Sequence, residues 1–364
     1  MSKRLKICIV ASSLAKGGAE RSSALLSQML SDIGHDIHIV TVLSGVAYPF
    51  SGVHFNLGAL KDSKDSFLSR VNRLLIFKKY LIANKFDIII DNRSRIQAYR
   101  EFLITKFIYT IPTIYVLHNY KTSKVFTKYT WLNKILYKDK VMTAVSKAAT
   151  KKFRKKFKLK DIRTIYNGFD FDEINNKALE GVALENDFII FYGRIDDEHK
   201  NLKLLLDSYK LSKLSKEGVK LLILGNGPDY DAIVQYSKDL KLENHIVFKG
   251  FIANPYPFVK NARFMVLSSR FEGFPMVIPE TLSLGVPVIS VDCKSGPKEV
   301  IKNEVNGLLV ENFDKNALSE AMNSFIFDQP LYQNCKENAK KSVLHLEVQV
   351  IKEEWKQLLI DLKL

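Results

Sequence analysis

The sequence is poor in cysteine and has no long apolar run. Its 364 residues include three cysteines, Cys8, Cys293 and Cys335, whose spacing matches neither a metal site nor a redox motif. Because so few thiols give no disulfide framework, we expect a reduced, cytoplasmic protein. No window offers about 20 uninterrupted apolar residues, and the N-terminus passes from basic residues directly into a short apolar strand. The sequence therefore predicts neither a secretory signal nor a membrane span.

Acidic residues are scarce in the first half of the chain only. Residues 1–180 contain 32 Lys and Arg against 14 Asp and Glu, an excess of +18, whereas residues 181–364 contain 23 against 25, or −2. The two halves sum to the formal net charge of +16 and are expected to face different partners. An anionic membrane surface or an anionic acceptor suits the basic half. Because no nucleic-acid-binding motif accompanies the basic residues, we do not predict a nucleic acid partner.

Short β-branched runs, separated by segments of helical period, dominate the rest of the pattern. These runs are 5–12, 36–42, 86–91, 112–118, 141–146 and 162–168, followed by 187–193, 219–225, 245–250, 262–268 and 286–291. Nearly continuous apolar runs with helices between them are typical of parallel sheets covered on both faces. We therefore predict an α/β protein of two Rossmann-like, doubly wound parallel-sheet domains that face a central cleft.

The predicted domain boundary is the polar segment 169–185, which lacks a clear period and is interpreted as a linker. It separates an N-terminal domain, 1–168, from a C-terminal domain, 186–345, and residues 346–364 are predicted to form a final helix. Ligands of doubly wound sheets bind beyond the carboxyl ends of the strands. The loops that follow the runs are therefore the places to look for a site.

Two of these loops have features suited to phosphate. Gly17 and Gly18 follow the first run and bring bare backbone to the positive start of a helix, although a Gly-Gly pair by itself favours the alternative, a tight strand-to-helix turn. Arg194 and Lys200 lie between a predicted strand and helix. A planar guanidinium and a point charge together suit a diphosphate leaving group. The alternative for this pair is two solvated surface charges.

A third loop carries two glutamates around a Gly-Phe-Pro turn. Glu272 precedes the turn, and Glu280 lies in a helix predicted to begin at about Met276. The first turn of that helix offers N–H groups to an anion. A carboxylate at position 280 can accept hydrogen bonds from a vicinal diol such as a ribose. The alternative is an acidic residue near the favourable end of a helix.

Eight segments occur in an order that indicates a family. They are GGAER, IYNGFD, GRIDDEHKN, LLILGNGPDY, FKGF, SRFEGFPMVIPETLSLGVPVI, GPKEVI and NGLLV. With them the chain resembles the retaining glycosyltransferases of sequence family 4, which have the two-domain GT-B fold. The resemblance covers nearly the whole length and is strongest to bacterial enzymes of O-antigen, capsule or lipid-linked oligosaccharide synthesis.

The resemblance implies roles for individual residues. Arg194 and Lys200 are implied to bind the donor diphosphate and offset its charge, Glu280 to hold the ribose hydroxyls, and Glu272 to lie at the transferred sugar. His118, at the end of the run 112–118, matches a histidine aimed at the donor sugar; a satisfied histidine at a strand end is the alternative. The remaining implied contacts to the nucleotide sugar are Gly17, Gly18, Gly225, Gly227, Phe251, Gly273, Phe274, Met276 and Val277.

The implied reaction retains the anomeric configuration. A hexose or N-acetylhexosamine moves from a nucleotide diphosphate sugar, UDP by family frequency, to a lipid-linked saccharide, and no metal is required. Asp170-Phe171-Asp172 imitates the metal-binding Asp-x-Asp of another glycosyltransferase fold, but it follows the IYNG segment at the crossover and is interpreted as structural. In this fold the N-terminal domain binds the acceptor, and a C-terminal helix packs back on it. Two alternatives to a transferase are a UDP-sugar 2-epimerase-like isomerase and a non-catalytic membrane-docking module.

Two basic segments of the N-terminal half suit the inner face of a cell membrane. Residues 65–85 predict a helix with Phe67, Val71, Leu74, Leu75 and Ile82 on an apolar stripe and most basic residues off it. Residues 147–160 have Lys or Arg at eight of fourteen positions, with Phe153 and Phe157 one turn apart. The alternative for the first segment is a core-facing helix with a solvated basic face. The alternative for the second is RNA binding, which no accompanying RNA-binding pattern supports.

Overall fold

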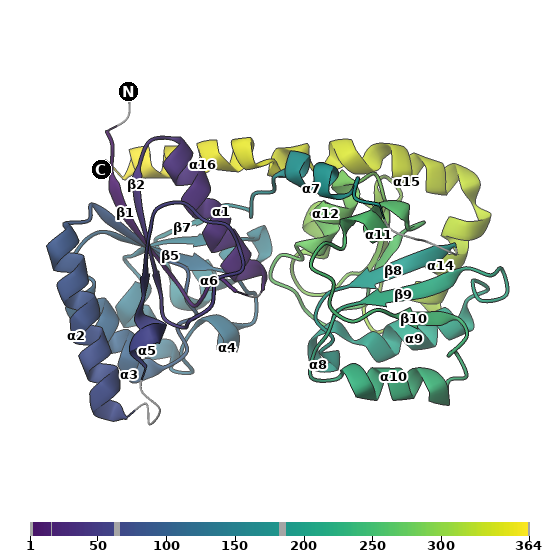
Figure 1. Cartoon of the computed structure of the whole chain (residues 1–364), viewed down its shortest axis with the longest axis horizontal. Coiled ribbons are helices and arrows are strands. Elements are labelled where there is room, and N and C mark those ends of the chain that lie inside the picture. Colours follow the sequence, from purple (N-terminus) through teal and green to yellow (C-terminus); the bar gives the residue numbers. More distant parts are fainter. Residues whose placement is uncertain (1–2, 16, 62–65, 182–186, 363–364) are drawn as a thin grey trace. The chain divides into compact units, whose positions relative to one another are not determined.

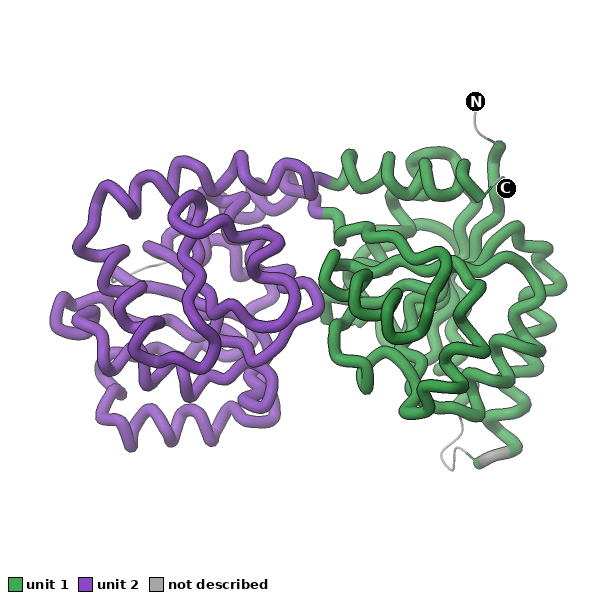
Figure 2. Tube along the Cα trace, turned by 180° about the vertical axis from the view of Figure 1, so that it is seen from behind, with its two compact units in different colours: residues 1–168, 348–364 green, residues 169–347 purple. Residues whose placement is uncertain are grey.

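The computed structural model describes residues 3–15, 17–61, 66–181 and 187–362, which form two compact units. Unit 1 comprises residues 1–168 and 348–364, and unit 2 comprises residues 169–347 (Figure 2). The chain therefore passes from unit 1 into unit 2 and back.

Unit 1 is built on a seven-stranded parallel sheet with the order β3-β2-β1-β4-β5-β6-β7 (Figure 1). Its strands are β1 (Lys6–Ala11), β2 (Asp36–Thr41), β3 (Val53–Asn56), β4 (Ile88–Asp91), β5 (Thr113–Leu117), β6 (Val141–Ala144) and β7 (Asp161–Thr164). Its helices are α1 (Gly18–Asp32), η1 (Leu57–Leu60), α2 (Phe67–Asn84), α3 (Ala98–Leu103), η2 (Ile104–Ile108), α4 (Thr122–Val125), α5 (Thr130–Tyr137), α6 (Lys147–Phe157) and α16 (Val348–Asp361).

Alternation along the strands divides the core of unit 1 into two layers. On β1, Ile7 and Ile9 face the helices α1 and α16, whereas Cys8 and Val10 face α2, η2, α5 and α6. Because both faces are covered, most residues of β1, β2, β4, β5 and β6 are buried, which is why these strands read as continuous apolar runs; the edge strands β3 and β7 are more exposed.

Unit 2 is built on a six-stranded parallel sheet with the order β10-β9-β8-β11-β12-β13. Its strands are β8 (Phe188–Tyr192), β9 (Lys220–Leu224), β10 (Ile246–Phe248), β11 (Met265–Leu267), β12 (Val288–Val291) and β13 (Gly307–Val310). Its helices are α7 (Phe171–Lys177), α8 (Asp197–Lys200), α9 (Leu202–Leu211), α10 (Tyr230–Asp239), α11 (Tyr256–Asn261), α12 (Val277–Ser283), α13 (Pro297–Val300), α14 (Lys315–Phe327), α15 (Gln329–Ser342) and η3 (Leu344–Leu346).

The predicted linker differs from the structure. Within 169–185, residues 182–185 lie outside the described residues, but Phe171–Lys177 form α7, which belongs to unit 2 and contacts α11 and α12. Asp170 caps this helix by accepting a hydrogen bond from the Glu173 amide at 2.7 Å. The segment is helical because the side chains of Phe171 and Ile174 are buried. A helix of seven residues is too short to show this burial as a periodic apolar pattern in the sequence.

The two basic segments also differ in part from expectation. In α6, Phe153 and Phe157 are fully buried and pack against Phe126, so they belong to the core. In α2 the predicted stripe divides between two faces: Leu74 packs on the core, whereas Leu75 and Ile82 are 51% and 61% exposed. The side chain of Phe67 lies outside the described residues.

Candidate active site

The loops after β8 and β9 meet at the carboxyl edge of the unit 2 sheet. Their backbones are so close that a Cβ on Gly225 would lie 1.8 Å from the Gly193 carbonyl oxygen, and one on Gly227 would lie 2.0 Å from that of Ile195. Gly225 also has a φ of 141°, which a side chain disfavours. The packing of these loops accounts for both glycines, and their predicted contact with a nucleotide remains a prediction.

Lys200 and Glu272 form an ion pair at the same edge. Lys200 ends α8, Glu272 follows β11, and the ammonium lies 2.7 Å from Glu272 Oε1. The two loops are fastened together because Ser268 donates to the Lys200 carbonyl at 2.9 Å and the Arg270 amide donates to the His199 carbonyl at 2.9 Å. The structure thus joins two residues that the sequence predicted separately.

The charge on Glu272 is held by its neighbours. Its side chain is 7% exposed, and burial alone would raise its pKa. The Lys200 ammonium outweighs this effect with help from His199, whose Nε2 lies 3.7 Å from Oε2, and together they lower the pKa of Glu272 to about 2. The carboxylate is therefore ionised at neutral pH. A buried anion and a cation stand together at the end of two parallel strands.

Glu280 lies one turn inside α12 and is 4% exposed. Tyr192, the last residue of β8, places its hydroxyl 3.2 Å from Glu280 Oε2 and 2.9 Å from the Val277 carbonyl oxygen. Burial, followed by the Glu280 charge, raises the pKa of Tyr192 well above its usual value, so the phenol keeps its proton. Tyr192 therefore ties Glu280 to the end of the central strand.

The remaining predicted residues of unit 2 lie between β11 and α12, at the start of α12, and on the loop after β10. Ser295 donates to the Gly273 carbonyl at 3.0 Å, and Phe274 is buried with its ring centroid 6.3 Å from that of Phe169. Met276 is the N-cap of α12, so the helix begins at Val277, one residue later than predicted. Phe251, after β10, is 77% exposed.

Arg194 is not drawn into the Lys200–Glu272 pair. Its side chain is 68% exposed, and its Nε lies 3.9 Å from Asp196 Oδ2. It stands on the loop after β8 with its guanidinium open to solvent. Its predicted contact with a diphosphate remains a prediction.

In unit 1 the turn after β1 carries Gly17 and Gly18 at the start of α1. Gly17 has a φ of 107°, and a Cβ there would lie 2.7 Å from Glu20 Oε2. A carboxylate from the first turn of the helix thus lies beside the glycines expected to cap a diphosphate. Burial raises the pKa of Glu20. The role predicted for the two glycines is untested.

His118 directly follows β5, next to the end of β4. Its Nε2 lies 2.7 Å from Oδ1 of Asn92, the residue after β4, and Nδ1 has no hydrogen-bond partner among the described residues. Burial, followed by the Arg95 charge, lowers the pKa of His118 to about 4. The ring is therefore neutral at pH 7 and can both donate and accept a hydrogen bond.

Three residues of these arrangements were missed from the sequence: Asn92, Tyr192 and His199. Each contacts a predicted residue only because two strands or loops lie side by side, as β4 lies beside β5. Only their positions in the sequence could have indicated these residues. Each lies at or just after the end of a predicted strand, or in the GRIDDEHKN segment.

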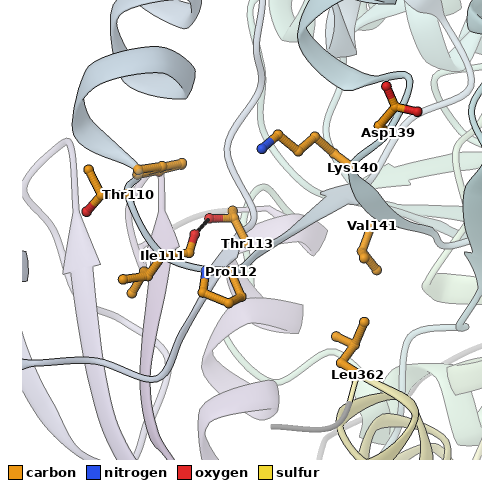
Figure 3. Close-up of a pocket in the computed structure, with 9 residues that line it drawn as sticks. Thr110, Ile111, Pro112, Thr113, Asp139, Lys140, Val141 and Leu362 are labelled. Atoms are coloured by element: carbon orange, nitrogen blue, oxygen red, sulfur yellow. Dashed lines mark hydrogen bonds between the residues drawn. The ribbon is translucent and has the colours of Figure 1, made fainter.

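A pocket of about 360 Å³ lies elsewhere in unit 1, at the amino ends of β5 and β6 (Figure 3). Thr113 and Val141, the first residues of these strands, line it together with Leu362 near the C-terminus. It contains none of the predicted site residues and lies at the opposite edge of the sheet from His118. Within the described ranges, no group of three or more His, Cys, Asp or Glu is placed to hold a metal ion.

Two family models match the chain. One, described as glycosyl transferases group 1, matches residues 172–342, and the other, described as glycosyltransferase family 4, matches residues 16–173. The structure is also similar to that of Anabaena HepE, solved with UDP and glucose, with a TM-score of 0.78. That likeness covers 98% of this chain and all of HepE at 19% identity, so it bears on the fold alone.

Two relatives of known activity are similar in sequence. The Campylobacter jejuni N-acetylgalactosamine-N,N'-diacetylbacillosaminyl-diphospho-undecaprenol 4-alpha-N-acetylgalactosaminyltransferase is 30% identical over 352 residues, covering 92% of this chain and 94% of that enzyme. The Escherichia coli lipopolysaccharide 1,6-galactosyltransferase is 37% identical over 142 residues, covering 38% of this chain and 39% of that enzyme. Matched over nearly its whole length, the chain belongs to the family 4 glycosyltransferases and has their GT-B fold.

Proposed function

We propose that this glycosyltransferase moves a hexose or N-acetylhexosamine from a UDP-sugar to a lipid-linked saccharide in the synthesis of a bacterial glycan, with retention at the anomeric carbon. The part of the proposal that concerns the UDP-sugar rests on the buried Lys200–Glu272 pair. Glu280 of the neighbouring helix α12 adds to it, because its carboxylate accepts a hydrogen bond from Tyr192. The three side chains come from the ends of two adjacent strands and the helix that follows, where doubly wound sheets bind nucleotides.

In the proposed reaction the bond from the anomeric carbon to the phosphate oxygen breaks, and a bond to the acceptor oxygen forms on the same face. The proton of the acceptor hydroxyl moves to the departing phosphate. Lys200 and Arg194 offset the negative charge that develops on the diphosphate. No metal is needed in this scheme, because the two cations supply the positive charge.

Glu272 contributes by accepting hydrogen bonds from the hydroxyls of the transferred sugar. A carboxylate with a pKa of about 2 remains an acceptor at any physiological pH. Its partner Lys200 is fixed by that same carboxylate, so the ammonium is oriented before a diphosphate arrives. Glu280 is proposed to accept from the ribose hydroxyls.

The proposed acceptor is lipid-linked. The C. jejuni relative acts, by its name, on a saccharide joined through a diphosphate to undecaprenol. In this chain, Leu68, Leu75 and Ile82 form an exposed stripe along α2, at intervals of seven residues and with exposures of 77%, 51% and 61%. No helix within the described residues is long and apolar enough to span a bilayer.

Neighbouring helices on the same face of the unit 1 sheet add to this surface. Phe107 on η2 is 52% exposed and Trp131 on α5 is 62% exposed, with Lys106 and Lys134 on the same helices. Exposed aromatic and aliphatic side chains among lysines suit the interface of an anionic bilayer. We propose that unit 1 docks there, on the inner face of the cell membrane.

The donor proposal is tested by calorimetric titration of the purified protein with UDP, GDP and ADP. We expect UDP to bind most tightly. Glu280→Ala should weaken the binding of all three nucleotides, because each carries the ribose diol, whereas Glu243→Ala, which changes an exposed glutamate of the same unit, should keep the wild-type affinities. If none of the three nucleotides binds the wild-type protein, the assignment of a nucleotide-sugar site to unit 2 is wrong. The acceptor is then sought by supplying labelled UDP-hexoses and UDP-N-acetylhexosamines with lipid-linked saccharides.

A further inference from the structure

The loop after β4 contains a network of buried charges that the proposed reaction does not use directly. Asp91 accepts two hydrogen bonds from the Arg93 guanidinium, at 3.0 and 2.8 Å, and one from the Arg93 amide at 3.0 Å. Glu101 of α3 lies 3.6 Å from the same guanidinium. All three side chains are at most 5% exposed. Removing a partner from such a network leaves a buried charge without compensation, so the geometry of the loop is strongly held.

Arg95 joins the ends of two strands. Its guanidinium is fully buried and donates to the carbonyl oxygens of Asp91 at 3.2 Å and Val116 at 2.6 Å, which belong to β4 and β5 respectively. A third bond goes to the Arg93 carbonyl at 2.7 Å. One rigid fork thus fixes the carboxyl ends of β4 and β5 relative to each other.

Asn92 and His118 directly follow the two strand ends that Arg95 holds together. Asn92 directly follows β4, is 6% exposed, and has its backbone amide bonded to the Val10 carbonyl of β1 at 2.8 Å. Its Oδ1 lies 2.7 Å from His118 Nε2. An amide oxygen can only accept, so this contact requires a proton on Nε2.

We propose that Asn92 is a positioning residue that fixes His118 as the Nε2–H tautomer, so that Nδ1 accepts a hydrogen bond from a hydroxyl of the transferred sugar. This inference rests on the proposed function for the identity of the hydroxyl, but not for the tautomer. Nδ1 is shielded from solvent and has no partner among the described residues, and a buried nitrogen of this kind favours a ligand that satisfies it. Arg95 acts with Asn92 by holding the two strand ends that carry the pair.

The charge of the surroundings supports the same assignment. An imidazolium would have no lone pair on either nitrogen and could not accept from a hydroxyl. Burial and the Arg95 charge lower the pKa of His118 to about 4, which keeps the ring neutral. With the amide of Asn92 turned over, its Nδ2 would donate to Nε2 and the proton would lie on Nδ1. These two arrangements make opposite predictions about which ring nitrogen is protonated.

The test is nitrogen NMR of the histidine rings in the full-length, ligand-free protein at neutral pH, with His118 assigned by comparison with His118→Gln. We expect a protonated Nε2 and an unprotonated Nδ1. Asn92→Asp keeps an accepting oxygen and should keep this tautomer, whereas Asn92→Ala should lose it. Asn133→Ala removes another buried asparagine, whose side chain is hydrogen-bonded to Thr127 in the loop before α5. This variant should leave the His118 signals unchanged.

Transfer assays then connect the tautomer to the sugar. We expect Asn92→Ala to lower kcat/KM by roughly tenfold or more, the loss of one oriented hydrogen bond, while the affinity for UDP, which has no hexose, is unchanged. A proton on Nδ1 in the wild-type protein overturns the proposal, as does an Asn92→Ala variant with unaltered tautomer and rate. If no sugar is transferred by the wild-type protein, the proposed function fails, yet the NMR result still decides the tautomer.

Discussion

The pairing of Glu272 with Lys200 ties the stability of unit 2 to pH. The pKa of Glu272 is about 2 in the folded chain against an ordinary value of 4.5, so the unfolded chain takes up a proton at this carboxyl first as the pH falls. The stabilisation is complete above the unfolded pKa and is lost as the pH falls toward the folded pKa. It amounts to about 3 kcal/mol for a shift of this size.

We therefore expect the unfolding free energy of the wild-type protein, relative to Glu272→Gln, to decline between pH 4.5 and pH 2. The glutamine has the same size but no proton to exchange in this range. Urea denaturation at a series of pH values measures the difference. A difference that stays constant as the pH falls would show that the carboxylate is not held ionised by Lys200.

The hydroxyl of Tyr192 is expected to matter for the nucleotide as well as for stability. In Tyr192→Phe the Val277 carbonyl and Glu280 lose the one buried hydroxyl proton that they share, at a cost of about 1–3 kcal/mol. Because Glu280 is then less well oriented, affinity for UDP should fall. The matched control is Tyr209→Phe on α9, which removes a buried hydroxyl bonded at 2.6 Å to the carbonyl of Val219; that residue precedes β9, at the amino edge of the sheet, opposite the site. Its stability should fall while its affinity for UDP is retained; equal losses of affinity in both variants would contradict the assignment.

At this scale the sequence predicted residue types better than partners. Lys200, Glu272 and Glu280 stand on the loops where the motifs place them, but the 2.7 Å contact between Lys200 and Glu272 depends on β8 lying beside β11. That adjacency skips two strands in the chain and has no local signal. Asn92 was missed although β4 and β5 are consecutive in the chain, because its contact with His118 depends on the pairing of the two strand ends and not on residue type.

At the scale of elements, α2 combines two opposite faces in one helix. Phe77 and Leu81 are buried against the sheet, whereas Leu68, Leu75 and Ile82 project from the other side. The helix begins after Ser66, whose side chain accepts from the Ser69 amide at 3.2 Å. The helix is already stabilised by its N-cap and by its buried face, so the three exposed side chains are not needed for its stability. We therefore attribute their exposure to contact with another surface.

Replacing Leu68, Leu75 and Ile82 by serine should therefore weaken binding to vesicles that contain anionic lipid. Because the side chains are exposed, the unfolding free energy should change by less than about 0.5 kcal/mol per site. Co-sedimentation with vesicles measures the binding. The control replaces Leu211, Phe327 and Leu344 of unit 2, which are 51%, 53% and 59% exposed, by serine. If the control loses as much binding as the α2 variant, the docking surface is wrongly placed.

The sequence predicted most elements because buried parallel strands are continuously apolar. It missed β3 and β13, which have only four residues each, are edge strands and have partly exposed side chains. It assigned α7 to a linker because seven residues are too few to display a helical period. Short elements are fixed by what they pack against, and that information lies elsewhere in the chain.

At the scale of the whole molecule, the chain crosses between the units twice, after Gly168 and after Glu347. The returning segment is part of the core of unit 1, since Ile351, Trp355, Leu358 and Leu359 of α16 are at most 5% exposed and pack with residues of α1 and β1. Each such side chain stabilises the fold by about 1.5–3 kcal/mol. Four of them together approach the whole stability of a typical domain, about 5–15 kcal/mol.

Ending the chain at Glu347 should therefore unfold unit 1 and leave unit 2 folded. Hydrogen exchange read by mass spectrometry should show the amides of β1 and β4 losing protection, while those of β8 and β9 keep it. Trp355→Ala in the full chain, a milder change, should weaken unit 1 by about 3–5 kcal/mol without affecting unit 2. Retained protection throughout the shortened chain would mean that α16 is dispensable.

The double crossing also sets an order for synthesis. A ribosome makes the sheet of unit 1 first, yet the residues of α16 that complete its core on the α1 side are translated only after the whole of unit 2. Unit 2, begun later, is the first to have all of its residues outside the ribosome. The sheet face that α1 covers only in part therefore keeps apolar side chains exposed while residues 169–347 are made, until α16 packs beside α1.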